Sequence, residues 1–377
     1  MVAHVISGRY RIPIRNVWLL MLYASDAFRR INADTRNSLE ENPDEIPDLV
    51  AEILTHEVER RLQRNLRLGW QTREAVVNRV RGRIDLRQTV SRRLLERGTV
   101  ACRFDEVTID TPRNRLVRAA LSKLSRIVGR AELARRCSFL SARLGNMGVN
   151  AERPNRADVS VNTFSHSDSR DRLMVAAALL AFDLALPSEE PGFTTMPTAL
   201  RDIEYLRVLF EKAVGGFYFV VLSHSGWQVN VGKTIRWPHD NATPGIPAIL
   251  PSMKTDIVLD HAGSGRRVVI DTKFTAIVTP GQYRVESLRS SHVYQIYAYL
   301  RSQEDDANPV AAKASGLLLH PSVGKEIDEA VVIQGHPIRF ATVDLSGPAM
   351  AIRRRLLAVK DPHPSLVVYG TPFFPLL

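Results

Sequence analysis

The chain has 377 residues, of which 45% are hydrophobic, and a formal net charge of +11. This length and hydrophobic content suffice for two domains with cores of their own. Its two cysteines, Cys102 and Cys137, form neither a CxxC pair nor a disulfide framework, so a reducing cytoplasm is the expected location. The longest apolar run near the start, residues 17–24, is too short to span a bilayer, and no signal-peptide cleavage pattern accompanies it.

The first half of the chain is expected to combine helices with one β-rich stretch. Residues 32–48 are acidic and polar, which is typical of a loop. Alternation and short turns predict strands within residues 69–110, and Thr111 with Pro112 is expected to cap the helix that follows. Apolar residues at helical spacing predict helices within 9–30 and at 49–67, 114–127, 131–144 and 173–186.

The best linker candidate is the Pro/Gly/Ser-containing segment 187–197. It divides the chain into an N-terminal domain, residues 1–190, and a C-terminal domain, residues 198–377. Both are expected to be of mixed α+β or α/β class. In the second domain the pattern predicts a helix at 203–215, strands at 217–222 and 227–236, and a β-hairpin at 255–274.

The hairpin is the most informative part of the sequence. Two short apolar strands, 255–260 and 267–274, are joined by a Gly/Ser turn. Because strand side chains alternate between faces, Asp271 and Lys273 emerge on the same side. Antiparallel pairing can bring Asp256 alongside them. The sequence therefore predicts two carboxylates and an ammonium on one patch of sheet.

These three groups are what metal-assisted phosphodiester cleavage needs. Asp256 and Asp271 would bind Mg²⁺, with Mn²⁺ as a possible substitute, and the ion would polarise the phosphate and activate a bound water. Lys273 would orient that water or offset developing charge. A plain alternative is an edge strand with solvated charges on one face. The apolar residues 268–270 favour a central strand instead, where charges are costly unless paired or metal-bound.

The order Asp256, hairpin, Asp271-x-Lys273 resembles the core motif of the PD-(D/E)xK nucleases. The sequence departs from that pattern at Thr255, where proline is usual. That position shapes the approach to the strand and supplies no ligand. The resemblance implies a restriction-endonuclease-like fold for the C-terminal domain.

The same resemblance implies two further site residues. Members of the superfamily often carry a Gln or Glu on the helix after the lysine strand, and Gln295 in the segment 284–301 matches it. They also often present a Glu from the preceding helix, which matches Glu211. The alternatives are an exposed amide on an ordinary amphipathic helix and a surface ion pair of Glu211 with Arg207.

Positive charge is concentrated in residues 60–143, which contain 22 basic and 7 acidic side chains. Nearly all of the bases are arginine, which favours bidentate contacts to phosphate or carboxylate. We expect this segment to meet a partner, with Arg81, Arg83 and Arg87 as the first candidates. Solvated helix faces in a genome that prefers arginine codons would produce the same density.

Two other patterns carry no site. Residues 226–234 resemble a phosphate-binding P-loop, but five residues separate the glycines where the motif has four, and no helix is predicted to follow. Ten histidines are scattered without metal-ligand spacing. Of these, His261 and His292 are expected on a loop and on a helix surface.

Several sequence blocks in the same order resemble the McrC family, the nuclease subunit of McrBC-type, modification-dependent restriction systems. They cover both halves of the chain: RIPIRNVWLLMLYASD at 11–26, RGRIDLRQTV at 81–90, FDEVTIDTPRNRLVRAALSKL at 104–124, LFE at 209–211, the Asp256 and Asp271-x-Lys273 motif, and YQIYAY at 294–299.

The family resemblance implies a partner, the AAA+ GTPase McrB, which forms hexameric rings and recognises methylated DNA. The N-terminal domain would dock on the ring and stimulate GTP hydrolysis, and the C-terminal domain would cut double-stranded DNA, with possible pairing of two nuclease domains. The expected function is therefore a Mg²⁺-dependent endonuclease subunit of a 5-methylcytosine-type system. Two alternatives stay open: a non-catalytic activator of an AAA+ motor, and a stand-alone PD-(D/E)xK nuclease.

Overall fold

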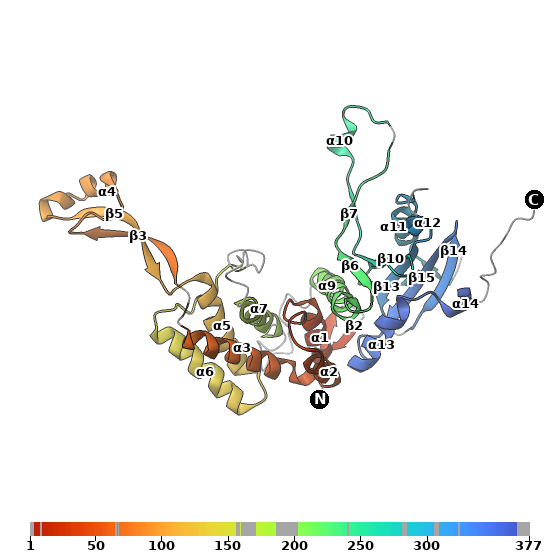
Figure 1. Ribbon diagram of the computed structural model, residues 1–377, viewed down its shortest axis with the longest axis horizontal. Helices are drawn as coiled ribbons and strands as arrows, with labels where there is room; N and C mark the ends of the chain where they lie inside the picture. The colour runs from red at the N-terminus through yellow and green to blue at the C-terminus, as the bar shows by residue number, and fades with distance from the viewer. Residues whose placement is uncertain are drawn as a thin grey trace, which may run out of the picture. The chain divides into compact units, whose positions relative to one another are not determined.

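The computed structural model describes residues 4–7, 10–64, 66, 68–155, 159, 171–185, 203–239, 241–280, 285–304, 309–322 and 325–367. The chain forms two compact units, shown in Figure 1. Unit 1 comprises Met1–Ile46 and Leu186–Leu377, and unit 2 comprises Pro47–Ala185. Among the described residues no helix combines the length and the apolar composition of a membrane span. Both units mix helices with strands, as expected for the α+β class.

Unit 1 is built on a six-stranded mixed sheet in the order β14-β15-β13-β10-β9-β6. Strand β10 pairs antiparallel with β9 and parallel with β13, while β13 pairs parallel with β15. The position of β10 confirms the prediction of a central, buried strand. The strands are β6 (Trp227–Val231), β9 (Ile257–His261), β10 (Arg266–Thr272), β13 (Ser315–Pro321), β14 (Asp328–Ile333) and β15 (His336–Val343).

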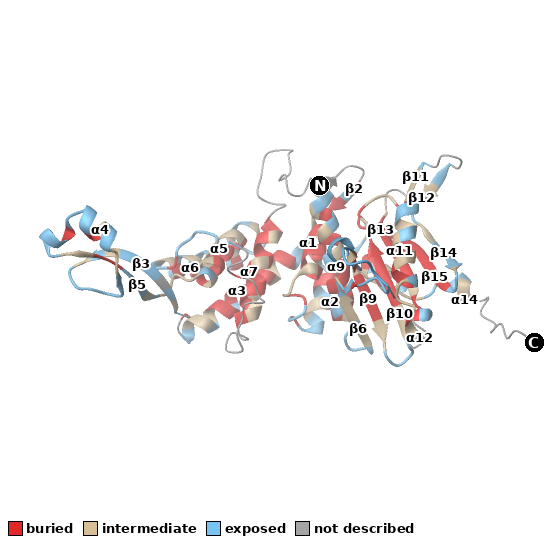
Figure 2. Cartoon of the chain, turned by 90° about the horizontal axis from the view of Figure 1, so that it is seen from above, coloured by how far each residue is buried: buried red, intermediate tan, exposed pale blue. Residues whose placement is uncertain are grey.

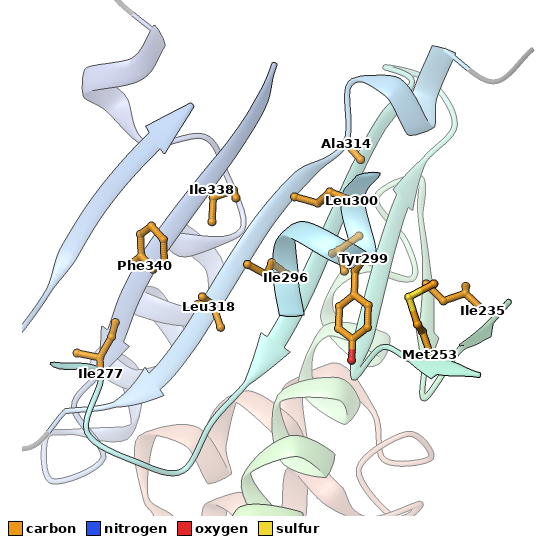
Figure 3. Packing of buried hydrophobic residues seen from close by; sticks show 11 residues of the cluster. Ile235, Met253, Ile277, Ile296, Tyr299, Leu300, Ala314, Leu318, Ile338 and Phe340 are labelled. Carbon is orange, nitrogen blue, oxygen red and sulfur yellow. The ribbon is translucent and has the colours of Figure 1, made fainter. Parts of the chain in front are cut away.

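Helix α11 (Ser290–Arg301) covers one face of this sheet. Ile296 and Leu300 on the helix pack with Leu318 and Phe340 of the strands in one buried cluster, shown in Figure 3. Gly316 on β13 lets the helix approach this face closely, because a Cβ at that position would crowd Ile296. Burial of these apolar side chains is what holds α11 over the sheet.

Helix α9 (Ile203–Leu222) packs on the opposite face, where Gly215 lies against Val231 and Ile257. It extends through residues 217–222, which were predicted as a strand. The prediction was wrong because β-branched and aromatic residues favour strands only as a weak preference, and tertiary burial overrides it. Tyr218, for example, is fully buried and donates a hydrogen bond to Leu356 O at 2.6 Å.

The N-terminal segment belongs to unit 1, which corrects the expected domain of residues 1–190. It forms a hairpin of β1 (His4–Ser7) and β2 (Tyr10–Pro13), followed by α1 (Ile14–Ala24) and α2 (Ala33–Glu41). Helix α1 packs on α9, and the Tyr23 and Phe217 rings lie 5.1 Å apart. Asn16 Nδ2 donates to Leu345 O and Gly347 O, both at 2.8 Å. These long-range contacts decide which unit residues 1–46 join.

The predicted loop at 32–48 instead contains α2 and a 3₁₀ turn, Pro43–Glu45. Asn32 Oδ1 accepts a hydrogen bond from Thr35 N at 2.8 Å, so a side chain caps the start of α2. The smaller elements of unit 1 are β7 (Thr234–Ile235), α10 (Ile246–Ile249), β8 (Met253–Lys254), β11 (Val278–Pro280), β12 (Glu286–Leu288), α12 (Pro309–Ala312), α13 (Ala349–Val359) and α14 (Pro364–Val367).

Unit 2 consists of a helical part and a three-stranded antiparallel sheet in the order β3-β5-β4. Helix α5 packs on both α6 and α7, and Thr111 caps α5 with Pro112 at its first turn, as predicted. Much of the sheet and of α4 is exposed (Figure 2). The elements are α3 (Ile46–Gln63), β3 (Gly69–Val77), β4 (Arg83–Ile84), α4 (Leu86–Ser91), a 3₁₀ turn (Leu94–Arg97), β5 (Val100–Thr108), α5 (Pro112–Ile127), α6 (Ala131–Asn146) and α7 (Arg172–Ala185).

Candidate functional site

The β9–β10 hairpin places Asp256 and Asp271 at the same end of the sheet. Ile257 pairs with Ile270 in the antiparallel ladder. Asp256 comes directly before β9, one residue beyond the last paired position, and its negative charge acts on Asp271. The two carboxylates that the sequence singled out are therefore neighbours.

Asp271 is the most deeply buried of the candidate residues, with 0% of its surface exposed. Lys273 Nζ donates a hydrogen bond to Oδ1 at 2.9 Å and lies 2.8 Å from Oδ2. Oδ2 itself accepts no hydrogen bond from the described residues. Burial raises the pKa of Asp271 to about 6, and the negative charge of Asp256 acts in the same direction, against the opposing charge of Lys273.

Asp256 is held from the neighbouring strand by Thr272. The Asp256 Oδ2 atom accepts hydrogen bonds from the backbone N and the Oγ1 of Thr272, both at 2.7 Å. Sequence reasoning missed this residue, although it stands between Asp271 and Lys273. Alternation placed the Thr272 side chain on the opposite face from Asp271. Asp256 lies just before β9, and no local sequence pattern predicts that its carboxylate contacts Thr272.

Glu211 lies on α9, half-buried and close enough to interact electrostatically with the pair. Burial, followed by the negative charge of Asp256, raises the pKa of Glu211. Glu211 does not form the alternative surface ion pair with Arg207, because Arg207 Nε donates to Glu204 at 3.0 Å. Arg207 is thus engaged elsewhere on the helix, and Glu211 lies beside the two aspartates.

Gln295 reaches the site through a second residue. Its Nε2 donates to the hydroxyl of Tyr299 at 2.6 Å, and that hydroxyl donates to Lys254 O at 2.7 Å. Lys254 precedes Asp256 by two residues, so the chain of hydrogen bonds supports the approach to that carboxylate. The structure brings Gln295 near the site and engages its amide with Tyr299.

Two histidines that the sequence did not connect with the site interact electrostatically with Lys273. The rings of His292 and His320 lie 5.6 Å apart. The positive charges of Lys273 and Arg289 act on both imidazoles. His292 was predicted as a helix-surface residue, but it is partly buried against His320.

The three arginines proposed for partner contact are exposed in unit 2. Arg83 lies on β4 opposite Arg103, and Arg87 lies on α4. The guanidinium of Arg81 stacks over the Phe104 ring at 4.9 Å. The three side chains are available to a partner surface and have no ion pair within the described part of the chain.

The donor set decides which ligand the hairpin fits. Within the described ranges no three carboxylate, imidazole or thiolate groups converge as a closed metal cage. Mg²⁺ does not require one, because it keeps several waters and is often held by one or two carboxylates plus substrate phosphate. Asp271 is fully buried, its Oδ2 is ion-paired with Lys273 at 2.8 Å, and the negative charge of Asp256 acts on it, so the site offers two carboxylates of the kind that a hard cation prefers.

Comparison with known proteins identifies the family of this chain. The model of the family described as "McrBC 5-methylcytosine restriction system component" matches residues 7–310 of this chain. The chain belongs to the McrBC family. The resemblance inferred from the sequence blocks is thereby confirmed, and the McrBC family comprises components of 5-methylcytosine restriction systems.

Individual McrBC relatives are distant. The chain is 20% identical over 359 residues to the Type IV methyl-directed restriction enzyme EcoKMcrBC of Escherichia coli K12, covering 93% of this chain and 98% of that protein. It is 18% identical to a chain in the half-complex of Thermococcus gammatolerans McrB AAA+ hexamers with bound McrC, with a TM-score of 0.43 and coverage of 92% and 76%. A second structure, the Thermococcus gammatolerans McrBC complex, matches at 16% identity, TM-score 0.33, over 52% and 58%.

Proposed function

We propose that this McrBC family member is the Mg²⁺-dependent DNA endonuclease subunit of a 5-methylcytosine-directed restriction system. The observation that carries the proposal is the convergence of Asp256, Asp271 and Lys273 at one end of the β9–β10 hairpin. Their order along the chain matches the PD-(D/E)xK motif. Membership in the McrBC family supports the same reading.

Each residue has a role that follows from its position. Asp256 and Asp271 would hold the cation, and Mn²⁺ would fit the same oxygen donors. When bound, the ion supplies charge stabilisation to the phosphate and lowers the pKa of a water. Lys273 has 19% of its side chain exposed, so its ammonium remains accessible to the water and to the phosphate while it neutralises Asp271.

Supporting residues keep the two carboxylates in place. Thr272 orients Asp256 with two hydrogen bonds. Glu211 adds a half-buried carboxylate on the α9 side of the site. Gln295 acts through Tyr299 on the backbone of Lys254, just before Asp256. These residues position the site, and the chemistry rests on the Asp/Asp/Lys set.

The proposed partner is a McrB-like AAA+ GTPase hexamer, in the cytoplasm. Family membership supports it, and a related assembly contains McrB AAA+ hexamers with bound McrC. In this chain the docking region would be unit 2, which carries the arginine-dense segment 60–143. DNA sequence or methylation would be read by the partner, because phosphate contacts of the nuclease site carry no sequence information.

The test is cleavage of methylated plasmid DNA by the full chain with its AAA+ partner, GTP and Mg²⁺. Asp271→Ala and Lys273→Ala should each abolish cutting while the complex still forms on size-exclusion chromatography. Retained cleavage in either variant would refute the site. If the parent chain stimulates the partner's NTPase but does not cut DNA, it is a non-catalytic activator. If it cuts DNA without any NTPase present, it is a stand-alone nuclease.

A further inference from the structure

The connection between β6 and β9 forms an arm that is rooted at the candidate site. Strand β6 ends at Val231 and β9 begins at Ile257, and these two residues are paired. Residues 232–255 (the arm) therefore leave the sheet and return to it at the end where Asp256 lies. Figure 1 shows the arm projecting from the sheet, with α10 near its tip.

The root of the arm is packed into the core of unit 1. Ile235 of β7 and Met253 of β8 pair with each other, and both are buried in the cluster that holds α11 over the sheet (Figure 3). Tyr299 of α11 belongs to this cluster and donates to Lys254 O at 2.7 Å. The position of the arm root is therefore fixed by buried apolar side chains.

Hydrogen bonds tie the arm to the site and its two legs to each other. At the root, Gly232 N donates to Asp256 O at 2.7 Å. Farther out, Trp237 Nε1 donates to Pro251 O at 3.0 Å and links the outgoing leg with the returning one. A surface on the arm is thus held at a defined position relative to Asp256.

The arm is basic and exposed. Its sequence holds three basic side chains against one acidic side chain, Asp240, which lies outside the described residues. Lys233, Arg236 and Lys254 are all exposed, and none of them forms an ion pair with a described carboxylate. Exposed cations without acidic partners are the kind of surface that attracts a polyphosphate chain.

Lys254 connects this positive charge with the carboxylates of the site. It pairs with Thr234 in the β7–β8 ladder, and paired residues share a face. The other pair of that ladder is buried against α11, so Lys254 faces away from the cluster. Its charge acts on Glu211, on which the charge of Asp256 acts as well. Two residues along the chain separate Lys254 from Asp256, which limits their Cα separation to about 7 Å.

We propose that Lys233, Arg236 and Lys254 bind backbone phosphates of the duplex that is cleaved at Asp256 and Asp271. A duplex on these carboxylates continues past the end of the sheet, where the arm projects. Lys233 and Lys254 contact it at the root of the arm, and Arg236 contacts it farther out. The inference rests on the proposed nuclease function and names the surface that grips the substrate. Such contacts hold the DNA in register without reading its bases.

The experiment measures DNA binding rather than cutting. The full chain is titrated into a fluorescein-labelled, unmethylated duplex with Ca²⁺ replacing Mg²⁺, and anisotropy is followed at several NaCl concentrations. The arm variant replaces all three cations of the arm with alanine. The control variant removes an equal charge by alanine replacement at three exposed positions elsewhere in unit 1: Arg30, Lys313 and Arg354.

We expect the arm variant to bind the duplex about tenfold more weakly, the scale of one charge-assisted hydrogen bond. The slope of log affinity against log salt should flatten by about 0.9 for each phosphate that the variant no longer neutralises. The control variant should stay near the parent. Equal affinities and slopes for the arm and control variants, or no duplex binding by the parent chain, would overturn the proposal.

A charge-preserving variant separates phosphate binding from a structural role of the arm. Lys233→Arg/Lys254→Arg keeps both cations and should retain the affinity of the parent. Thermal unfolding verifies that this variant and the arm variant fold. A loss of affinity as large as that of the arm variant would mean that charge is not the cause, and the proposal would be wrong.

A tip variant separates DNA binding from protein docking. Ile249 and Leu250, on α10 and directly after it, are exposed apolar residues at 75% and 42%. Ile249→Ser/Leu250→Ser should leave DNA affinity unchanged. If the arm variant keeps its DNA affinity but no longer co-elutes with the AAA+ partner, the arm docks a protein and the proposal fails. The cleavage test of Asp271→Ala does not depend on this result, so the two proposals fail separately.

Discussion

Lys273 and Asp271 form an ion pair in which one partner is fully buried and the other is not. Nζ lies within 2.9 Å of both carboxylate oxygens, and the exposed fractions of the side chains are 19% and 0%. Asp271 near the end of β10 and Lys273 just after the strand supply the two charges. The pair lets the sheet carry a carboxylate in its interior while the ammonium stays accessible.

Removing the lysine should therefore destabilise the fold as well as the site. Lys273→Met leaves Asp271 without its counter-ion, and loss of one partner of a buried pair costs about 3–5 kcal/mol. The double variant Asp271→Asn/Lys273→Met should recover most of this loss and remain inactive. Urea unfolding at pH 8 measures the difference. A Lys273→Met protein as stable as the parent would show that the pair is not coupled.

Thr272 should control cleavage through Asp256. Thr272→Val removes the hydroxyl that donates to Asp256 Oδ2 and keeps the shape of the side chain. Loss of this bond to a charged acceptor should lower the cleavage rate about tenfold. Thr272→Ser, which retains the hydroxyl, is the matched control and should stay near the parent rate. Equal rates for the valine and serine variants would dismiss the orienting role.

Gly216 should be irreplaceable in α9. A Cβ there would collide with the carbonyl oxygen of Tyr23 on α1. Alanine favours helices by about 1 kcal/mol over glycine, but overpacking against rigid backbone should outweigh that gain, with a net loss of about 2 kcal/mol. Gly245→Ala, where nothing lies near the added atom, is the control. Thermal unfolding of both variants tests the prediction.

The network around Asp328 should make unit 1 sensitive to acid. Burial by itself raises the pKa of Asp328, but hydrogen bonds from Arg339 and Arg355 outweigh it and bring the pKa to about 2. A lowered folded pKa stabilises the protein above the unfolded value near 4, and the gain disappears as pH falls through about 2.

Asp328→Asn should therefore lower the free energy of unfolding at pH 7 by roughly 1 kcal/mol, allowing for solvent screening. The gap between variant and parent should close between about pH 4 and pH 2. Urea titrations at pH 7 and pH 3 provide the comparison. A gap of constant size over that range would exclude titration of Asp328 as its cause.

If the proposed AAA+ GTPase partner is stimulated through unit 2, charge reversal at Arg81, Arg83 and Arg87 should abolish that stimulation. The three side chains are exposed in unit 2, and acidic replacements would repel a surface that arginine binds. Phosphate release by the partner, with and without the variant chain, is the readout. The matched control reverses three exposed arginines on helices of the same unit, Arg126, Arg135 and Arg143. Unchanged stimulation by the Arg81/Arg83/Arg87 variant would show that these three arginines are not in the interface.

Several expectations failed where tertiary contacts outweighed local preference. Residues 217–222 have the composition of a strand, yet burial of Tyr218 and its neighbours continues α9 through them. Residues 32–48 look polar enough for a loop, yet Asn32 caps a helix there. The first 46 residues join unit 1 because α1 packs on α9, and no sequence pattern within those residues predicts this contact.

The sequence predicts the part of the candidate site that depends on neighbouring residues of one hairpin. Alternation within one strand requires Asp271 and Lys273 to share a face, and a short turn between apolar runs requires the hairpin that brings Asp256 near. His320 was not readable, because its place beside Lys273 depends on the register of β10 with β13, 47 residues along the chain. A slip of one residue would turn that imidazole to the other face, and only the packing of both faces of the folded sheet selects the register.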